Sequence, residues 1–137
     1  MNDCIFCKII AGEVPADKVY EDDTTIAFID VHPINPGHTL VVPKKHYENI
    51  LDTPKDVLAA MIQTAQKVAK ATMAAVDAPA VNIGMNNGAE AGQVVFHSHF
   101  HVIPRFANDG YKSWERKEGS LLTYDKASVE KIRNAFK

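Results

Sequence analysis

Three histidines, His97, His99 and His101, occupy alternate positions in the second half of the sequence. The residues around them, 93–103, are rich in β-branched and aromatic side chains, which predicts a strand. Because alternate side chains of a strand point to the same face, the three imidazoles are expected to share one face, about 7 Å apart along the backbone. Such a face is costly to bury unless it binds something, so the spacing indicates a functional site.

Two kinds of chemistry fit three imidazoles on one face. In the first, the histidines ligate a catalytic zinc ion, which needs a third ligand and an open position for water. In the second, one neutral ring attacks phosphorus, because the ordinary pKa of histidine lies close to neutral pH. That ring must keep its proton on the other nitrogen, typically against a backbone carbonyl group, while neighbouring rings donate to the phosphate oxygens. The histidines alone leave both alternatives open.

Composition limits the other classes of function. The 137 residues are one domain by length, with 46% hydrophobic and 23% charged residues. A net charge of −2 gives no basic field, so nucleic acid is not expected as a partner. No segment approaches the roughly 20 apolar residues of a membrane span, and the N-terminus lacks the basic and apolar regions of a secretory signal. We therefore expect a cytoplasmic protein with no membrane partner.

The elements expected around the histidines define an α+β domain with a mostly antiparallel sheet. Helices are expected at 5–10, from an N-cap at Thr53 through Val76, and at 126–136 after an N-cap at Asp125. Besides the histidine segment, strands are expected at 19–20, 25–29, 39–42 and 81–85. The glycine-containing loop at 86–92 is expected to join the last two strands in an antiparallel hairpin.

Cys4 and Cys7 form a C-x-x-C pair. The pair does not follow a strand and open a long helix, which disfavours a thioredoxin-like redox motif. In a cytosolic chain, half of a zinc site and a pair of reduced, buried thiols are the remaining alternatives. A zinc site needs two further ligands, and His46 and His97 are the candidates.

The sequence resembles the histidine triad (HIT) superfamily over roughly residues 4–105. The triad is followed by two apolar residues, as in that superfamily, and further motifs stand in the family's order and spacing. These motifs are Phe6 with Lys8-Ile9-Ile10, Glu21-Asp22-Asp23, Ala27-Phe28-Ile29-Asp30, the run from Gly37 to His46, Asn86-x-Gly88 and Gly92-Gln93. The tail, 106–137, resembles that of bacterial members, so the chain as a whole is expected to be a single HIT domain.

The resemblance implies a HIT-like fold and an enzyme that hydrolyses or transfers nucleotides at the α-phosphate. Its substrate would be a nucleoside phosphoramidate, a dinucleoside polyphosphate or a related nucleotide, and Nε2 of His99 would form a nucleotidyl-histidine intermediate. His101 would bond the phosphate and help to move protons. By the same resemblance, Gln93 would hold the leaving group and Asn86 would bind near the phosphate.

A purine nucleotide pocket is also implied by the resemblance. Phe28 and Val31 would form its walls, with Phe6 nearby, and Asp30 would accept hydrogen bonds from the ribose hydroxyls. The chemistry agrees, because an aromatic face stacks on a purine and one carboxylate can accept from two adjacent hydroxyls.

The resemblance further implies that Cys4, Cys7, His46 and His97 hold a zinc ion. Four protein ligands close the coordination shell, so this zinc is expected to be structural, with no organic cofactor. A homodimer paired through the long helix and a strand is expected as well. The alternatives are a zinc-dependent hydrolase that uses the triad as metal ligands, and a nucleotide-binding module with little turnover.

Two residues depart from the family pattern. Ser98 stands where the family usually has an apolar residue, on the strand face opposite to the imidazoles, so it is expected to affect packing and not chemistry. Val94 stands where many members have a serine or threonine that bonds the phosphate. Losing one hydrogen bond to a charged group costs about 1.5–3 kcal/mol of transition-state binding, so slower turnover or a different substrate is expected.

Overall fold

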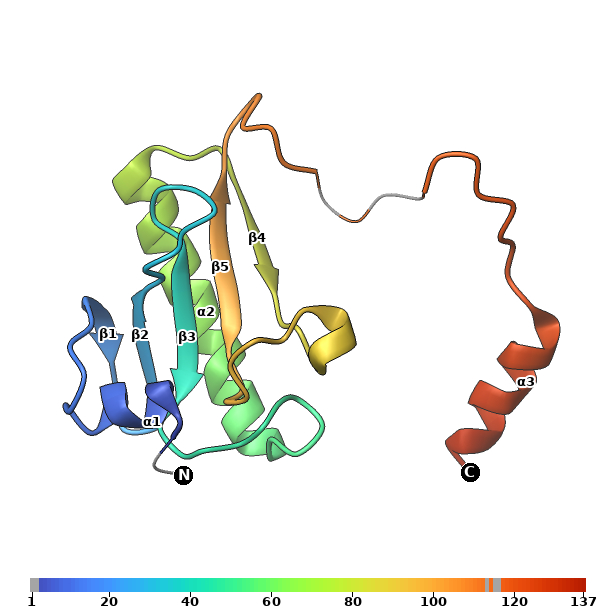
Figure 1. The fold of residues 1–137 in the computed structure, drawn as a ribbon, viewed down its shortest axis with the longest axis horizontal. Helices are drawn as coiled ribbons and strands as arrows, with labels where there is room; N and C mark the ends of the chain where they lie inside the picture. Colours follow the sequence, from blue (N-terminus) through green and yellow to red (C-terminus); the bar gives the residue numbers. More distant parts are fainter. Residues whose placement is uncertain (1–2, 113, 115–116) are drawn as a thin grey trace.

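One antiparallel sheet of five strands forms the centre of the molecule (Figure 1). The computed structural model describes residues 3–112, 114 and 117–137. Along the sheet, the order is β1 (Lys18–Glu21), β2 (Thr25–Ile29), β3 (Thr39–Pro43), β5 (Phe100–Arg105) and β4 (Ala80–Gly84). Neighbouring strands run antiparallel throughout, and β4 and β5 form the hairpin that the sequence predicts, joined by a loop that contains the 3-10 turn η1 (Ala89–Ala91).

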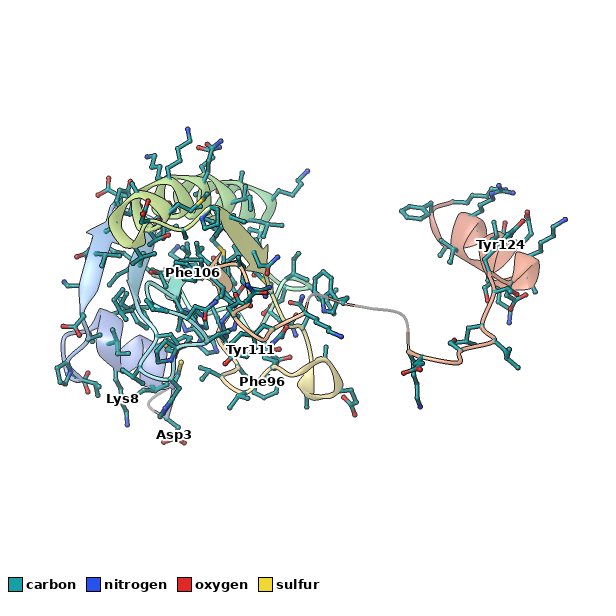
Figure 2. All side chains as sticks on the ribbon, turned by 90° about the horizontal axis from the view of Figure 1, so that it is seen from above. Asp3, Lys8, Phe96, Phe106, Tyr111 and Tyr124 are labelled. Carbon is teal, nitrogen blue, oxygen red and sulfur yellow. The ribbon has the colours of Figure 1, made fainter. Side chains whose placement is uncertain are left out.

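The long helix α2 (Lys55–Val76) covers one face of the sheet, as Figure 2 shows. Its buried residues recur at three- and four-residue spacing, as in an amphipathic helix, and include Ala65, Val68 and Ala69. These residues pack against Val41 of β3 and Val102 of β5. The packing fixes the two strands that border the histidines.

The opposite face of the sheet carries the short helix α1 (Ile5–Ile10) and the loop that contains Phe96 (Figure 2). Phe28 of β2 and Leu40 of β3 point to this side and cluster with Phe6 of α1. Because both faces of β2 and β3 are covered, these strands are buried along almost their whole length. The sheet is therefore covered by α2 on one face and, over β2 and β3, by α1 on the other.

Most of the elements lie where the sequence predicts them. α1 and β2 have the predicted bounds, and β1, β3 and β4 differ from the prediction by no more than one residue at either end. The N-cap of α2 is an exception, because Pro54 and not Thr53 takes that position. The hydroxyl of Thr53 instead donates to the carbonyl oxygen of Asn49 at 2.6 Å, inside the preceding loop.

The prediction of a strand beginning at position 93 is wrong, because β5 begins only at Phe100. Pairing with β3 ends there, since Pro43 has no N–H to donate and its carbonyl oxygen lies 2.9 Å from Nε2 of His97. His97 and His99 therefore precede the strand. The three imidazoles still lie on the same side of the sheet, because the rings of His97 and His99 both contact Phe6 of α1 and the ring of His101 contacts that of His99. The ring of His97 in addition faces the sulfurs of Cys4 and Cys7.

The chain beyond β5 starts in a polar network and ends far from the sheet. The Arg105 guanidinium makes two hydrogen bonds of 2.8 Å to the Asp109 carboxylate. Farther on, α3 (Lys126–Ala135) follows its predicted N-cap, Asp125. None of its residues is buried, and Figure 1 shows it apart from the rest of the molecule. The division into a core, 4–105, and an extension, 106–137, stays a prediction. Among the described helices, none is long and apolar enough to cross a membrane.

Candidate functional site

A cavity of about 510 Å³ lies on the sheet face opposite to α2. The residues predicted to bind the nucleotide all line it, together with two histidines of the triad. These residues are Phe6, Phe28, Asp30, Val31, His99 and His101. α1 supplies one wall, the end of β2 and the loop after it supply another, and the histidines form the floor at the start of β5. The structure thus brings these residues together, and the role of each stays a prediction.

His99 is held in one tautomer by the backbone. Its Nδ1 lies 2.6 Å from the carbonyl oxygen of His97, so Nδ1 carries the proton and donates it. Nε2 is left as an unprotonated nitrogen with a lone pair. Burial lowers the pKa of His99, although its bond to the His97 carbonyl and the charge of Asp30 oppose the shift. The ring is therefore neutral at pH 7 and suited to attack an electrophile.

His101 is held in the other tautomer by a chain of hydrogen bonds that begins at the backbone. The N–H of Ile34 donates to Nδ1 of His38 at 2.9 Å, so Nε2 of His38 carries the proton. That nitrogen lies 2.9 Å from Nδ1 of His101, which accepts from it. The remaining nitrogen of His101, Nε2, must then carry a proton in the neutral ring. His101 is consequently a hydrogen-bond donor next to the acceptor ring of His99, with the ring centroids 5.0 Å apart.

Both rings of this relay are neutral at physiological pH. Burial, followed by the neighbouring His99 and His38, lowers the pKa of His101 to about 4. Burial also lowers the pKa of His38, against the opposing charge of Asp30. Oδ2 of Asp30 lies 3.4 Å from Nε2 of His38. Oδ1 of Asp30 accepts a hydrogen bond from the backbone N–H of His32 at 2.9 Å. The site therefore presents neutral imidazoles with fixed donor and acceptor directions.

His38 is a residue to which the sequence assigned no role. In the sequence, His38 stands inside the motif from Gly37 to His46 and has no distinguishing spacing of its own. Its position directly before the buried strand β3 gave a weak signal, because polar residues next to buried strands are usually hydrogen-bonded. Its contact with His101 joins residues that are 63 positions apart in sequence, which no local pattern could predict.

A second cavity, of about 480 Å³, adjoins the first. Asp30, His32, Asn86 and His101 line both cavities, whereas His99 lines only the first. His101 therefore stands between two spaces, one bounded by the aromatic residues of α1 and β2 and the other reached from β4. A substrate with two parts joined near His101 would fit this arrangement.

The two amide side chains assigned to catalysis have different surroundings. Asn86 lines both cavities, and its Nδ2 donates to the carbonyl oxygen of Gly92 at 3.3 Å. Gln93 is buried, and its side chain is occupied by four hydrogen bonds to neighbouring loops. These bonds run from Gln93 Nε2 to the carbonyl oxygens of Glu48 and Val95, and to Gln93 Oε1 from the backbone N–H of Gly88 and Nδ2 of Asn49. Gln93 is not among the residues that line the first or the second cavity.

The two departures from the family pattern are both accommodated. Ser98 is fully buried, and its hydroxyl lies 3.0 Å from the hydroxyl of Thr53, so this polar side chain is hydrogen-bonded in the interior. Val94 lines the first cavity with 85% of its surface exposed. Its apolar side chain faces space that a substrate could occupy and adds little to the core.

His97 belongs to a separate cluster with Cys4, Cys7 and His46. The candidate ligand atoms of these four residues all lie within 4.8 Å of one another. Because Nε2 of His97 donates to the Pro43 carbonyl at 2.9 Å, its Nδ1 presents a lone pair to the cluster. Burial and the neighbouring Cys4 raise the pKa of the Cys7 thiol, and a bound metal cation would favour its thiolate form.

The spacing in this cluster fits a tetrahedral zinc ion. Zinc–sulfur and zinc–nitrogen bonds of ordinary length place sulfur and nitrogen ligands about 3.6 Å apart and two nitrogens about 3.3 Å apart. Nδ1 of His97 lies 3.4 Å from Cys4 Sγ and 3.6 Å from Cys7 Sγ. The two imidazole nitrogens lie 3.1 Å apart. The donor set of two thiols and two imidazoles is the one expected for a closed structural site.

The triad does not converge on a single point where a catalytic metal could bind. Among the described residues, the two groups of candidate metal ligands are the cysteine cluster and a set formed by Asp30, His38 and His101. Each contains only one histidine of the triad, and His99 belongs to neither. This separation disfavours the alternative in which all three histidines ligate a catalytic zinc.

Comparisons with known proteins agree with this architecture. The family model described as HIT domain matches residues 11–108, so the chain belongs to the HIT domain family. It is 41% identical over 131 residues to the adenylylsulfatase HINT3 of Arabidopsis thaliana. The alignment covers 96% of this chain and 66% of that longer protein. The chain thus spans slightly less than two thirds of the length of that relative.

Solved structures share the fold. The crystal structure of SMU.412c from Streptococcus mutans UA159 aligns with a TM-score of 0.91 and 40% identity, covering 100% of this chain and 87% of that one. A Zn-bound histidine triad family protein from Mycobacterium smegmatis aligns with a TM-score of 0.78 and 34% identity, covering 98% of each chain. The predicted α+β, HIT-like fold is therefore confirmed.

Proposed function

We propose that this protein is a nucleotide hydrolase or transferase that cleaves at the α-phosphate of a nucleoside phosphoramidate, a dinucleoside polyphosphate or a related nucleotide. The observation that carries the proposal is the 2.6 Å hydrogen bond from Nδ1 of His99 to the His97 carbonyl. It leaves Nε2 as a nucleophile in a cavity of about 510 Å³, beside a ring that presents an N–H donor. Membership of the HIT domain family, with an adenylylsulfatase among the relatives, supports the same class of reaction.

The reaction takes two steps in this proposal. In the first, Nε2 of His99 bonds to the α-phosphorus while the bond from phosphorus to the leaving group breaks. In the second, water bonds to the phosphorus, the phosphorus–nitrogen bond breaks, and His99 is regenerated with release of a nucleoside monophosphate. Nε2–H of His101 donates a hydrogen bond to the phosphate oxygens. The leaving group takes a proton from solvent in the first step, and the attacking water gives one proton back to solvent in the second step, so the neutral ring of His101 is unchanged.

The two adjoining cavities fit the two parts of such a substrate. The base would lie against Phe6, Phe28 and Val31 in the first cavity, with Asp30 accepting from the ribose hydroxyls. The leaving group would extend past His101 into the second cavity. Asn86 borders both spaces, as a residue near the phosphate should.

Cys4, Cys7, His46 and His97 would hold zinc as a structural ion. When bound, the ion would cross-link the start of the chain to the segment before β5, and it would take no part in the chemical steps. The Zn-bound relative from Mycobacterium smegmatis supports this assignment, as does the spacing of the four side chains. Ligation by two reduced thiols also favours the cytoplasm as the compartment.

Intact-protein mass spectrometry tests the proposed function. Zinc-loaded protein would be mixed with an adenosine 5′-phosphoramidate and stopped within milliseconds in alkaline denaturant, because phosphorus–nitrogen bonds are acid-labile. The expected result is a transient mass gain of one adenylyl group, which is absent in His99→Ala although its zinc content is unchanged. Zinc loss together with activity in His99→Ala would favour the metallohydrolase. Tight binding of adenosine monophosphate without any turnover would favour a binding module.

We also propose that the protein is a homodimer to which the C-terminal extension contributes. Its large apolar side chains face solvent in the single chain, among them Leu121 and Phe136, which are 94% and 87% exposed. The Streptococcus mutans structure aligns over 100% of this chain, the extension included, at a TM-score of 0.91. A short helix held away from its own sheet in this way needs a second surface, and a second copy would supply it.

Sedimentation velocity tests the homodimer. The wild-type chain is expected to sediment as a dimer at micromolar concentration. The double substitution Ile132→Asp with Phe136→Asp, both in exposed positions of the extension, is expected to shift dissociation to higher concentration. A wild-type chain that is monomeric at all concentrations, or a variant that dimerises equally well, contradicts the proposal.

A further inference from the structure

We propose that metal binding at the cysteine cluster and nucleotide binding in the first cavity are thermodynamically coupled through α1, so that each raises the protein's affinity for the other. The inference rests on the proposed function, because it assumes that the cavity takes a nucleotide. It goes beyond that function by making the metal site a determinant of nucleotide affinity.

The first link is Phe6, which lies between the two cysteines in sequence. Cys4 and Cys7 point their sulfurs toward Nδ1 of His97, while Ile5, Phe6 and Ile9 line the nucleotide cavity. The ring of Phe6 is buried and makes edge contacts with Phe28 and His99, with centroid distances of 5.4 and 5.1 Å. One turn of helix thus carries both a pair of metal ligands and a wall of the cavity.

The second link is His97, whose side chain and backbone serve different sites. Its ring contributes Nδ1 to the metal cluster, and its carbonyl oxygen accepts the proton of His99 Nδ1 at 2.6 Å. A metal ion that restrains the ring of His97 therefore also restrains the His97 carbonyl oxygen, which orients the ring of His99. The ring of Phe6 reaches this residue too, at a centroid distance of 5.9 Å.

A helix as short as α1 needs such restraint. Six residues form too few hydrogen bonds to be stable alone, so the position of α1 depends on what its side chains contact. With the four ligands joined by a metal, α1 is held against the sheet and the cavity keeps its wall. Without the metal, a nucleotide must draw α1 into place at the expense of its own binding energy. Linkage then requires the nucleotide to favour metal binding by the same factor.

The experiment measures both halves of this cycle on the full chain. Isothermal calorimetry gives the Kd of adenosine monophosphate for zinc-loaded and metal-free protein. Competition with a chelating dye gives the zinc affinity with and without saturating adenosine monophosphate. Both measurements are expected to give the same coupling factor, about fivefold or larger.

Two substitutions in α1 locate the coupling. Phe6→Ala keeps all four metal ligands but removes the side chain that reaches the cavity, so the coupling factor is expected to fall toward one. Ile10→Ala is the matched control, because Ile10 packs against the core around Phe6 but is not among the residues that line the cavity. Its coupling factor is expected to match that of the wild type.

The outcomes separate this inference from the proposed function. If adenosine monophosphate binds zinc-loaded and metal-free protein equally well, the inference is wrong and the proposed function stands. If adenosine monophosphate binds neither form, both are wrong. If the Phe6→Ala and Ile10→Ala variants lose coupling to the same extent, the coupling does not pass through the cavity wall, and the inference is overturned.

Discussion

The carbonyl oxygen of His97 accepts the Nδ1 proton of His99 at 2.6 Å, and this single contact determines which nitrogen of His99 can react. The neighbouring His101 has the opposite arrangement, because its Nδ1 accepts from His38. Two histidines that are two positions apart are thus given different tautomers by different partners. One becomes an acceptor toward the cavity and the other a donor, which is the pairing that attack on a phosphate requires.

His38 sets the tautomer of His101 and lines the second cavity but not the first, in which adenosine monophosphate would bind. Its loss is therefore expected to affect turnover more than the binding of adenosine monophosphate. His38→Phe removes the donor to His101, and kcat for an adenosine phosphoramidate is expected to fall about 100-fold. The Kd of adenosine monophosphate should change by less than about twofold, because its binding contacts remain. His38→Gln, whose Nε2 can donate from a similar position, should restore much of the rate. Equal losses in both variants would indicate a purely structural role.

The neutral form of His101 makes stability dependent on pH. Its pKa is about 4 in the folded protein and 6.5 ordinarily, so between these values the unfolded chain binds a proton that the folded chain does not. The stabilisation that comes from keeping His101 neutral is fully present above pH 6.5. As the pH falls toward 4, the free energy of unfolding drops by roughly 3 kcal/mol at most. Urea denaturation at several pH values should show a shallower acid loss in His101→Asn. Parallel curves for the two proteins would contradict this explanation.

Val94 offers a test of the hydroxyl that the family pattern places there. Val94→Thr adds a hydroxyl without changing the shape of the side chain, and with 85% of Val94 exposed, packing is hardly affected. A new hydrogen bond to the phosphate should raise kcat/KM about tenfold. Val94→Ala is the control for the methyl groups and should leave kcat/KM near the wild-type value. A threonine variant no faster than the alanine variant would show that the phosphate does not reach this position.

Gln93 is expected to matter for stability as well as for any role in catalysis. Gln93→Ala leaves the partly buried N–H of Gly88 and the carbonyl oxygen of Glu48 without this partner, so the free energy of unfolding should fall by about 1–3 kcal/mol. Urea denaturation measures the loss. Because the amide group of Gln93 is hydrogen-bonded to the loops, it is not expected to contact the leaving group. The ratio of kcat/KM for two substrates with different leaving groups should therefore be the same in the variant as in the wild type. A changed ratio with unchanged stability would instead support direct contact with the leaving group.

The parts of the fold that depend on local pattern could be predicted from the sequence. α1 and β2 were predicted with their observed bounds because apolar runs and turn residues mark both of their ends. α3 was predicted from its N-cap, and Asp125 does accept the N–H of Ala127. The residues assigned to the nucleotide pocket also lie around one cavity, although that assignment came from resemblance and not from periodicity.

The features that could not be predicted depend on contacts between distant segments. The late start of β5 reflects Pro43, which belongs to the neighbouring strand and offers no N–H at the position opposite Ser98. The division of the triad between two sites depends on Cys4, Cys7 and His46, which lie far from His97 in sequence and meet its ring, whereas His99 and His101 line the cavity. The occupation of Gln93 by loop contacts likewise involves backbone groups up to 45 positions away.

The separation of Cys4 from His97 by 93 positions has a consequence for biosynthesis. A nascent chain exposes both thiols when it leaves the ribosome, but the last member of the cluster follows only after most of the sheet has been made. At the proposed metal site all four ligands are present only after His97 has been synthesised, so an ion would be inserted late in maturation. In a cell short of such an ion, chains would form their core while Cys4 and Cys7 remain without the proposed metal cross-link to His97.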